Sequence, residues 1–212
     1  NTPAHEEHDP SHLLISPLDG QRVAIAPQKR KVRHGFEYDA VVLGAGPAGE
    51  AAAMKLAKSG LKVAVIDPRD QVGGNCAHVG TIPSKALRQS VFNIISMRRD
   101  PIFSSFTDNF QVPLNKVLSK ARRVIASQVN SHKLCYERNR VESMQGGVRF
   151  IDKNTLEVEQ VHGEGAKTVT FEKAVIAVGS RPYRPDLLDF DHPRVFDSDK
   201  ILQMDYVARK II

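Results

Sequence analysis

Cysteine is scarce in this chain of 212 residues, which contains only Cys76 and Cys135. Two cysteines so far apart in the sequence provide neither the disulfide framework of a small secreted domain nor the ligands of a metal cluster. We therefore expect no metal site, and we expect the chain to work in a reducing compartment, the cytoplasm.

Long apolar runs are also missing, and none approaches the roughly 18 residues that a membrane-spanning helix needs. Residues 1–10 are polar and include Glu6, Glu7 and Asp9, so they do not resemble a signal peptide. The 14 glycines and 12 prolines are too few and too scattered for a collagen-like or low-complexity polymer. With 41% hydrophobic and 25% charged residues, the composition is that of a soluble globular protein that can bury a core.

The net charge of +6 is concentrated in one part of the sequence, because residues 85–140 contain eleven Lys or Arg residues and only three acidic residues. The apolar residues of this segment recur at helical spacing, which predicts two amphipathic helices with a basic face on the second. The apolar positions are Leu87, Val91, Ile94 and Ile95, then Leu114, Val117, Leu118, Ala121 and Ile125, and the basic face holds Lys116, Lys120, Arg122 and Arg123. No aromatic stacking platform or zinc-ligand spacing accompanies the charge, so a solvated face is favoured and nucleic acid is not an expected partner.

The first 36 residues differ in character from the rest and are expected to form a partly ordered arm. Apolar runs at residues 13–16 and 23–26 flank a Pro-Leu-Asp-Gly turn, which is typical of a small hairpin. Because residue 1 is Asn, we also expect this sequence to be part of a longer chain.

From Tyr38 onward the pattern changes to buried strands and helices. An apolar run at 39–43, an Ala-rich helix from about 47 to 59 that stops at Gly60, and a second apolar run at 61–66 together predict a βαβ unit with parallel strands. Short β-rich runs at 148–151, 155–158, 168–171 and 174–177 predict a meander that returns to the sheet.

Residues 44–49, Gly-Ala-Gly-Pro-Ala-Gly, match G-x-G-x-x-G at the turn between the first strand and the helix. In this motif Gly44 permits a tight turn, Gly46 lets a pyrophosphate approach the backbone, and Gly49 lets the helix lie close to the sheet. The helix N-terminus adds free N–H groups and the positive end of the helix dipole. Asp67, at the end of the second strand, is placed to bind ribose hydroxyls and argues against a 2′-phosphate. The sequence therefore predicts that FAD or NAD, rather than NADP, binds here.

Residues 72–85, Val-Gly-Gly-Asn-Cys-Ala-His-Val-Gly-Thr-Ile-Pro-Ser-Lys, resemble the redox segment of the flavoprotein disulfide reductases, whose pattern is G-G-x-C-x-x-x-x-G/C-C-x-P-S-K. Cys76 matches the first cysteine of that pattern, but Thr81 stands where the family has the second. Without a resolving thiol, no intramolecular disulfide can store the electrons of the flavin. This variant of the motif, followed by Ala-Leu-Arg, is similar to the members of the family that act as pyridine nucleotide transhydrogenases. Further matches at 136–139, 179–183 and 197–199 extend the resemblance over residues 38–212.

The resemblance implies an α/β fold, an FAD-binding Rossmann-type parallel sheet with an inserted helical pair and a β-meander. It implies two catalytic residues: Lys85, which would stabilise negative charge beside the reactive flavin nitrogen, and Cys76, which is either a reactive thiol near the flavin or a small buried residue. Ser84 is expected to cap the first helix of the pair, and His78 and Cys135 are expected to be structural. The predicted FAD-binding residues are Gly44, Gly46, Pro47, Ala48, Gly49, Asp67, Pro68, Arg69, Gly73, Gly74, Cys76, Gly80, Thr81, Lys85, Gly147, Ala177, Val178, Gly179 and Ser180.

The implied activity is the passage of hydride from NADPH through FAD to NAD, in a homo-oligomer whose substrates are pyridine nucleotides. The sequence contains no second G-x-G-x-x-G, so residues 37–212 are expected to be the first segment of an FAD-binding domain. The nicotinamide and dimerisation domains would lie outside it, and this portion alone would be inactive. Two alternatives stay open. One is a flavoenzyme that uses Cys76 as a single redox thiol, and the other is a non-catalytic FAD-binding or interaction module whose basic helix face docks an acidic partner or nucleic acid.

Overall fold

The computed structural model describes residues 35–107, 111–159, 165–204 and 206–211, together with two short strands nearer the N-terminus. These strands, β1 (Leu13–Ile15) and β2 (Arg22–Ala24), pair in antiparallel fashion and overlap the two runs for which the sequence predicts a hairpin. Apart from residues 35 and 36, the other residues of the predicted arm lie outside the described residues.

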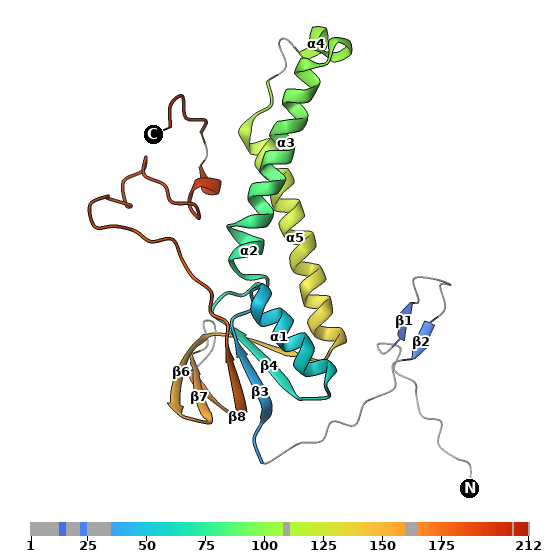
Figure 1. Cartoon of the computed structure of the whole chain (residues 1–212), viewed down its shortest axis with the longest axis vertical. Coiled ribbons are helices and arrows are strands. Elements are labelled where there is room, and N and C mark those ends of the chain that lie inside the picture. Colours follow the sequence, from blue (N-terminus) through green and yellow to red (C-terminus); the bar gives the residue numbers. More distant parts are fainter. Residues whose placement is uncertain are drawn as a thin grey trace.

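A six-stranded sheet in the order β5-β4-β3-β8-β7-β6 forms the base of the molecule (Figure 1). Its first four strands are parallel, and the last two add to them as an antiparallel meander. The strands are β3 (Tyr38–Leu43), β4 (Val63–Asp67), β5 (Glu142–Gln145), β6 (Gly147–Asp152), β7 (Thr155–Glu159) and β8 (Ala166–Ile176). The α/β fold with a parallel sheet and a meander is therefore as the sequence predicts.

The last strand differs from the prediction. The runs at 168–171 and 174–177 form one strand, β8, because no Gly or Pro between them ends the extended backbone. The N-terminal part of β8 pairs with β7 and its C-terminal part pairs with β3. The edge strand β5 was not predicted, because its four residues, Glu-Ser-Met-Gln, lack the apolar pattern of a strand.

The buried strands have two covered faces. Ala40 and Val42 of β3 face one apolar cluster together with α1, whereas Val41 and Leu43 face a second cluster together with the meander. Side chains alternate along a strand, so residues 40–43 of β3 contribute to both clusters with an apolar side chain at each position. This explains the unbroken apolar run that the sequence shows here.

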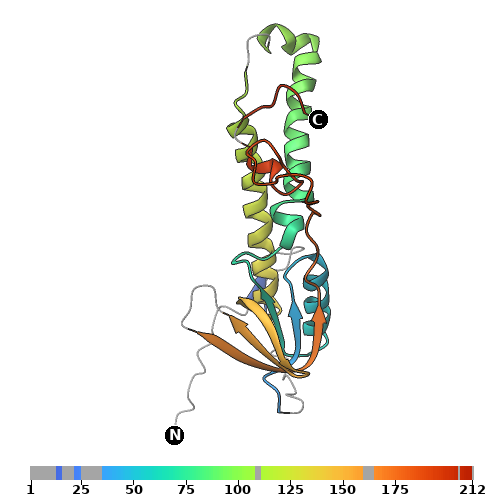
Figure 2. The ribbon, with the colours of Figure 1, turned by 90° about the vertical axis from the view of Figure 1, so that its left-hand side faces the viewer.

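The helices lie on one face of the sheet and extend far beyond it (Figure 1). They are α1 (Pro47–Lys58), α2 (Gly74–His78), α3 (Thr81–Arg99), α4 (Pro101–Thr107) and α5 (Leu114–Arg138). The two amphipathic helices of the prediction are α3 and α5, which run side by side as an inserted pair (Figures 1 and 2). The four basic side chains predicted on the outer face of α5 are exposed. None of the described helices is long and apolar enough to cross a membrane.

The start of α3 corrects one prediction. The helix begins at Thr81, with Gly80 in the N-cap position, so Ser84 lies inside the first turn and does not cap it. The Ser84 hydroxyl instead donates to the Thr81 carbonyl oxygen, at 3.2 Å. A cap at Ser84 would put the start too late, because Pro83 already lies in the first turn, where its missing N–H costs no helical hydrogen bond.

The first turn of α1 lies very close to the loop that follows β3. A Cβ atom added to Gly49 would be 1.9 Å from the Gly44 carbonyl oxygen and 3.3 Å from a Val42 side-chain carbon. Only glycine fits at this point, as the motif predicts.

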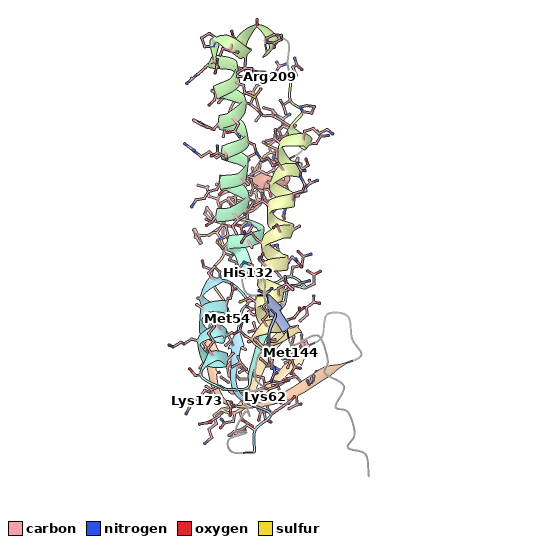
Figure 3. All side chains as sticks on the ribbon, turned by 90° about the vertical axis from the view of Figure 1, so that its right-hand side faces the viewer. Met54, Lys62, His132, Met144, Lys173 and Arg209 are labelled. Carbon is pink, nitrogen blue, oxygen red and sulfur yellow. The ribbon has the colours of Figure 1, made fainter. Side chains whose placement is uncertain are left out.

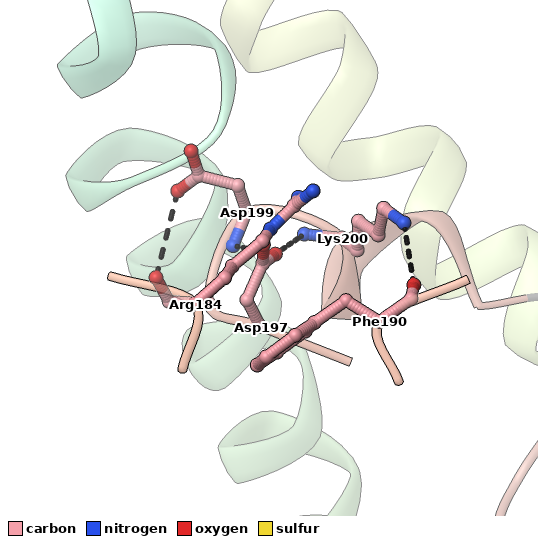
Figure 4. A network of polar contacts seen from close by, with 6 residues as sticks. Arg184, Phe190, Asp197, Asp199 and Lys200 are labelled. Atoms are coloured by element: carbon pink, nitrogen blue, oxygen red, sulfur yellow. Dashed lines mark hydrogen bonds and ion pairs between the residues drawn. The ribbon is translucent and has the colours of Figure 1, made fainter. Parts of the chain in front are cut away.

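Beyond β8 the chain runs as an irregular segment beside the helical pair (Figures 1 and 2). The Asp197 carboxylate organises this segment: it accepts hydrogen bonds from the Arg184 side chain at 2.6 and 2.8 Å and from the backbone N–H groups of Asp199 and Lys200 (Figure 4). The Lys200 ammonium donates to the Phe190 carbonyl oxygen at 2.9 Å. The N–H of Lys200, followed by the Arg184 guanidinium, lowers the pKa of Asp197.

Because the pKa of Asp197 is lowered in the folded protein, its stabilising effect is present above the unfolded value of about 3.9 and is lost as the pH falls through the lower native value. We expect Asp197→Asn to remove most of this acid dependence and to increase hydrogen exchange in residues 184–200 at neutral pH. The matched control is Asp186→Asn, at an exposed position of the same segment. Equal exchange rates in both variants would contradict this role.

The contact between Gly49 and Gly44 predicts a specific loss of stability. Gly49→Ala should lower the free energy of unfolding by about 1–3 kcal/mol, because a backbone carbonyl must move to accept the methyl group. Gly46→Ala is the matched control, since the nearest atom to its added Cβ is 3.8 Å away. Urea unfolding would measure both, and a loss of similar size in the two variants would show that the contact is not tight.

Candidate functional site

A cavity of about 530 Å³ lies at the carboxyl ends of the parallel strands, beside the N-terminus of α1. Five separate stretches of chain line it, which is the arrangement that open parallel sheets use to bind ligands. The lining residues are Leu43, Gly44, Gly46, Pro47 and Ala48; Ile66, Asp67, Pro68 and Arg69; Gly74, Asn75 and Cys76; Gly146, Gly147 and Val148; and Ala177, Val178, Gly179 and Ser180.

The glycine loop is fixed to the strands on both sides of β3. The Gly44 N–H donates to Ile66 O at 2.7 Å, and Leu43 O accepts from the Ala177 N–H at 2.8 Å. Gly44 has a φ of +105°, and a Cβ atom there would lie 2.3 Å from Ala177 O. The turn therefore requires glycine for its backbone angle and for its contact with the end of β8.

Gly46 faces the open cavity and precedes the first turn of α1. The first bond of the helix runs from the Glu50 N–H to Gly46 O, at 2.8 Å, so the N–H groups of Ala48 and Gly49 have no carbonyl partner within the helix. Pro47 occupies the first helical position, where its missing N–H costs nothing. Free N–H groups and the positive end of the helix dipole together form a site for an anion such as a pyrophosphate.

Asp67 has a structural task that the sequence did not reveal. One of its carboxylate oxygens accepts from the Ala45 N–H at 2.8 Å and the other from the Arg69 N–H at 2.9 Å. Each carboxylate oxygen can accept more than one hydrogen bond, so Asp67 can still bind ligand hydroxyl groups in the cavity. The same side chain thus holds the glycine loop in place and offers an acceptor to a ligand.

Asn75 joins two sides of the cavity. Its side-chain oxygen accepts from the Arg69 guanidinium at 2.6 Å, and its side-chain nitrogen donates to Ser180 O at 2.7 Å. These bonds link the loop after β4, helix α2 and the segment after β8. Asn75 was not predicted as a site residue because it occupies the unspecified position of the G-G-x-C pattern.

Most of the predicted FAD-binding residues come together in this cavity. Those that line it are Gly44, Gly46, Pro47, Ala48, Asp67, Pro68, Arg69, Gly74, Cys76, Gly147, Ala177, Val178, Gly179 and Ser180. Five others do not line it: Gly49 lies under the glycine loop, Gly73 precedes α2, and Gly80, Thr81 and Lys85 lie at the start of α3. The side chains of Thr81 and Lys85 are exposed. Besides Asn75, sequence reasoning missed Leu43, Ile66, Gly146 and Val148, which are neighbours of predicted residues.

Two predicted structural residues make contacts away from the cavity. The His78 Nε2 atom lies 2.9 Å from Val72 O, within the turn that leads into α2. The Cys135 sulfur lies 3.4 Å from the Met54 sulfur, between α5 and α1. No disulfide joins the two cysteines.

A group of polar side chains lies behind the glycine loop, where α5 passes α1. The His132 Nδ1 atom is 2.8 Å from the Glu50 carboxylate, and both side chains are about one fifth exposed. One turn further along α5, the Tyr136 hydroxyl is buried and has no hydrogen-bond partner among the described residues. Burial, followed by the charges of Glu50 and Asp67, raises the pKa of Tyr136. Glu50 and His132 thus meet on the side of α1 that faces α5.

Comparison with known proteins agrees with this geometry. The chain is 48% identical to the soluble pyridine nucleotide transhydrogenase of Azotobacter vinelandii over 177 residues, which is 84% of this chain and 38% of that protein. It is 46% identical over 179 residues to the protein of the same name from Enterobacter sp. (strain 638), again with 84% and 38% coverage. The chain thus spans less than two fifths of the length of these relatives.

Solved structures show the same fold. The HOCl-induced flavoprotein disulfide reductase RclA from Escherichia coli superposes on 80% of this chain and 34% of its own, with a TM-score of 0.64 and 25% identity. Its Cu(II) complex gives a TM-score of 0.65 at 24% identity over 79% of this chain and 34% of its own. The family model described as pyridine nucleotide-disulphide oxidoreductase matches residues 38–212, and the chain therefore belongs to the pyridine nucleotide-disulphide oxidoreductase family.

Proposed function

We propose that the cavity at the carboxyl ends of β3, β4 and β8 binds FAD. The observation that carries this proposal is the glycine loop, in which Gly46 opens into the cavity directly in front of the N-terminus of α1. Asp67 at the end of β4 and a chain of backbone groups from Ala177 to Ser180 supply the further polar contacts that a dinucleotide requires. Likeness to a flavoprotein disulfide reductase supports FAD as the dinucleotide.

The residues divide into three groups along the proposed ligand. The N–H groups at the start of α1 would hold the pyrophosphate, Asp67 would bind the ribose hydroxyls of the adenosine, and Gly147 would lie against the adenine. Arg69, Pro68 and the segment from Ala177 to Ser180 would close the sides. The flavin would then extend past Cys76 toward the start of α3, where Gly80, Thr81 and Lys85 lie.

For the complete protein we propose soluble pyridine nucleotide transhydrogenase activity in the cytoplasm, within a homo-oligomer. In this reaction a hydride leaves NADPH, which becomes NADP⁺, and NAD⁺ receives it and becomes NADH. Bound FAD supplies the two-electron carrier between the two nucleotides. Residues 37–212 would provide the first segment of the FAD-binding domain, with residues 1–36 as an appended arm. The nicotinamide site would lie in the part that the longer relatives have in addition.

Thr81 is the residue that separates this activity from disulfide reduction. A dithiol relay needs an attacking and a resolving thiol, and Thr81 cannot act as either. The Lys85 ammonium would stabilise negative charge on the flavin ring, while Thr81 offers only a hydroxyl.

One observation favours a second candidate function. Cys76 lines the cavity, so its thiol is placed where a flavin-linked redox thiol would be. In that case the protein would be a single-cysteine flavoenzyme of the same family, and Cys76 would be required for activity.

Flavin binding is tested by Gly46→Val. The isopropyl group would occupy the space in front of α1 that the pyrophosphate needs, so we expect the variant to be purified without the flavin absorbance of the wild type. Ala51→Val is the control, because Ala51 is an exposed position of the same helix and does not line the cavity. Flavin retained by the Gly46 variant would refute the pyrophosphate assignment.

The role of the thiol is tested by Cys76→Ser in the complete protein. If hydride passes between the nucleotides without a thiol, kcat for the transfer from NADPH to an NAD analogue should stay within about threefold of the wild-type value, a change of less than 1 kcal/mol in the activation free energy. Lys85→Met should lower kcat by about tenfold or more, because the positive charge is removed while the length of the side chain is kept. Loss of activity in the cysteine variant would favour the single-thiol enzyme.

A further inference from the structure

We propose that Asn75 is a positioning residue that controls how fast FAD enters and leaves the cavity, by joining Arg69 to Ser180 across the proposed pyrophosphate position. This inference rests on the proposed binding of FAD. The Arg69 guanidinium donates to the Asn75 side-chain oxygen at 2.6 Å, and the Asn75 side-chain nitrogen donates to Ser180 O at 2.7 Å. The bridge formed by these three residues is the strap of the cavity.

The two ends of the strap lie on opposite sides of the glycine loop. Arg69 follows β4 and Ser180 follows β8, and these two strands flank β3 in the sheet. Neighbouring strands lie about 4.8 Å apart, so the ends of β4 and β8 are separated by about 10 Å. The glycine loop at the end of β3 lies between them, and the strap therefore spans the cavity from one side of this loop to the other.

Close packing fixes the backbone of Asn75 beside the glycine loop. A Cβ atom on Gly74 would lie 2.6 Å from the Gly46 Cα, and the Gly73 N–H donates to a carbonyl oxygen of the glycine loop at 2.8 Å. A Cβ atom on Gly73 would also lie 3.6 Å from the ring of His132, which Figure 3 labels where the helical pair meets the sheet. Since Gly46 faces the cavity in front of α1, the side chain of Asn75 begins next to the proposed pyrophosphate position.

The strap lies at the outer rim of the cavity. Arg69 and Ser180 are exposed and Asn75 is half-buried, whereas Leu43 and Ile66 at the ends of β3 and β4 are buried. All five residues line the same cavity. A ligand held against the buried ends of the strands would therefore lie between them and the strap.

Hydrogen bonds connect both ends of the strap to the sheet. At one end the Arg69 N–H donates to the Asp67 carboxylate at 2.9 Å, and at the other the Ala177 N–H donates to β3 at 2.8 Å. The next residue, Val178, is 70% exposed and therefore packs little against the rest of the protein. The bond from Asn75 to Ser180 O thus holds this exposed segment toward the cavity.

The shape of FAD makes such a strap a barrier in both directions. The pyrophosphate is its narrow middle, with adenosine on one side and the flavin on the other, so FAD with its middle under the strap cannot slide out lengthwise. One of the two strap bonds must open whenever FAD enters or leaves. Loss of the strap should therefore raise the association and dissociation rate constants together, and their ratio, the dissociation constant, should change little.

The experiment measures both rate constants for FAD and the complete apoprotein, by following flavin fluorescence after rapid mixing and after dilution. Asn75→Ala removes both strap bonds, so each rate constant should rise by about threefold to tenfold, the effect of one or two exposed hydrogen bonds, while the dissociation constant changes by less than about twofold. The matched control is Asn93→Ala, because Asn93 is an exposed asparagine of α3 that hydrogen-bonds Gln89 and does not line the cavity. This control should keep the wild-type rate constants.

The outcomes separate this inference from the proposal beneath it. If the wild-type protein binds no FAD, the proposed function fails. If FAD binds and Asn75→Ala leaves both rate constants unchanged, the cavity assignment stands and the strap is wrong. A faster dissociation at an unchanged association rate would also overturn the strap, because it would show that Asn75 contacts the ligand without obstructing its path.

A second variant covers the case in which Asn75→Ala folds poorly and shows a lower thermal midpoint without cofactor. Asn75→Leu keeps a side chain of similar volume but has no hydrogen-bonding group, so it opens the strap without leaving a space. Both rate constants should rise in this variant as well, and wild-type values in a well-folded Asn75→Leu protein would refute the inference.

Discussion

The close contact between α1 and the loop after β3 is the constraint on which the rest of the site depends. Because Gly49 has no side chain, the first turn of α1 rests on the Gly44 carbonyl, and the helix N-terminus is held beside the ends of the strands. Asp67 completes the arrangement from β4 by accepting the Ala45 N–H. The anion site is thus built from backbone groups whose positions are fixed by packing, so a ligand does not have to organise them.

The charged and polar groups around this loop lie on two sides of α1. In front of α1 the N–H groups attract an anion and Asp67 offers its carboxylate to the same cavity, whereas on the far side of the helix Glu50 contacts His132. The contact of His132 with Glu50 joins the long helix α5 to the first turn of α1. The inserted helical pair therefore contributes to the site through its base, although most of its length extends away from the sheet (Figure 1).

The sequence predicted the parts of the fold that depend on local pattern. The continuous apolar run of β3 indicates a strand buried on both faces, and the glycine motif indicates the turn and the helix that follow it. The edge strand β5 pairs with β4, and the single long strand β8 pairs with β3 and β7. Neither the sequence Glu-Ser-Met-Gln of β5 nor the Glu172-Lys173 pair within β8 indicates these distant partners. For the same reason the sequence indicates that the Asp67 carboxylate can bind a ligand, but not that it accepts the Ala45 N–H and so fixes the glycine loop. Asn75 and His132 act through partners far away in the sequence, Ser180 and Glu50, and no local motif marks such pairs.

The position of β8 next to β3 has a consequence for the order of folding. These neighbours are separated by more than a hundred residues in the chain, as the hydrogen bond from Glu37 to Thr170, across 133 positions, illustrates. The contact between Gly44 and Ala177 cannot form until the chain has been synthesised past β8. Until then, the glycine loop of the βαβ unit is exposed on the side that β8 covers in the folded protein. A cofactor that binds in this cavity would therefore find its site complete only after the whole meander has joined the sheet.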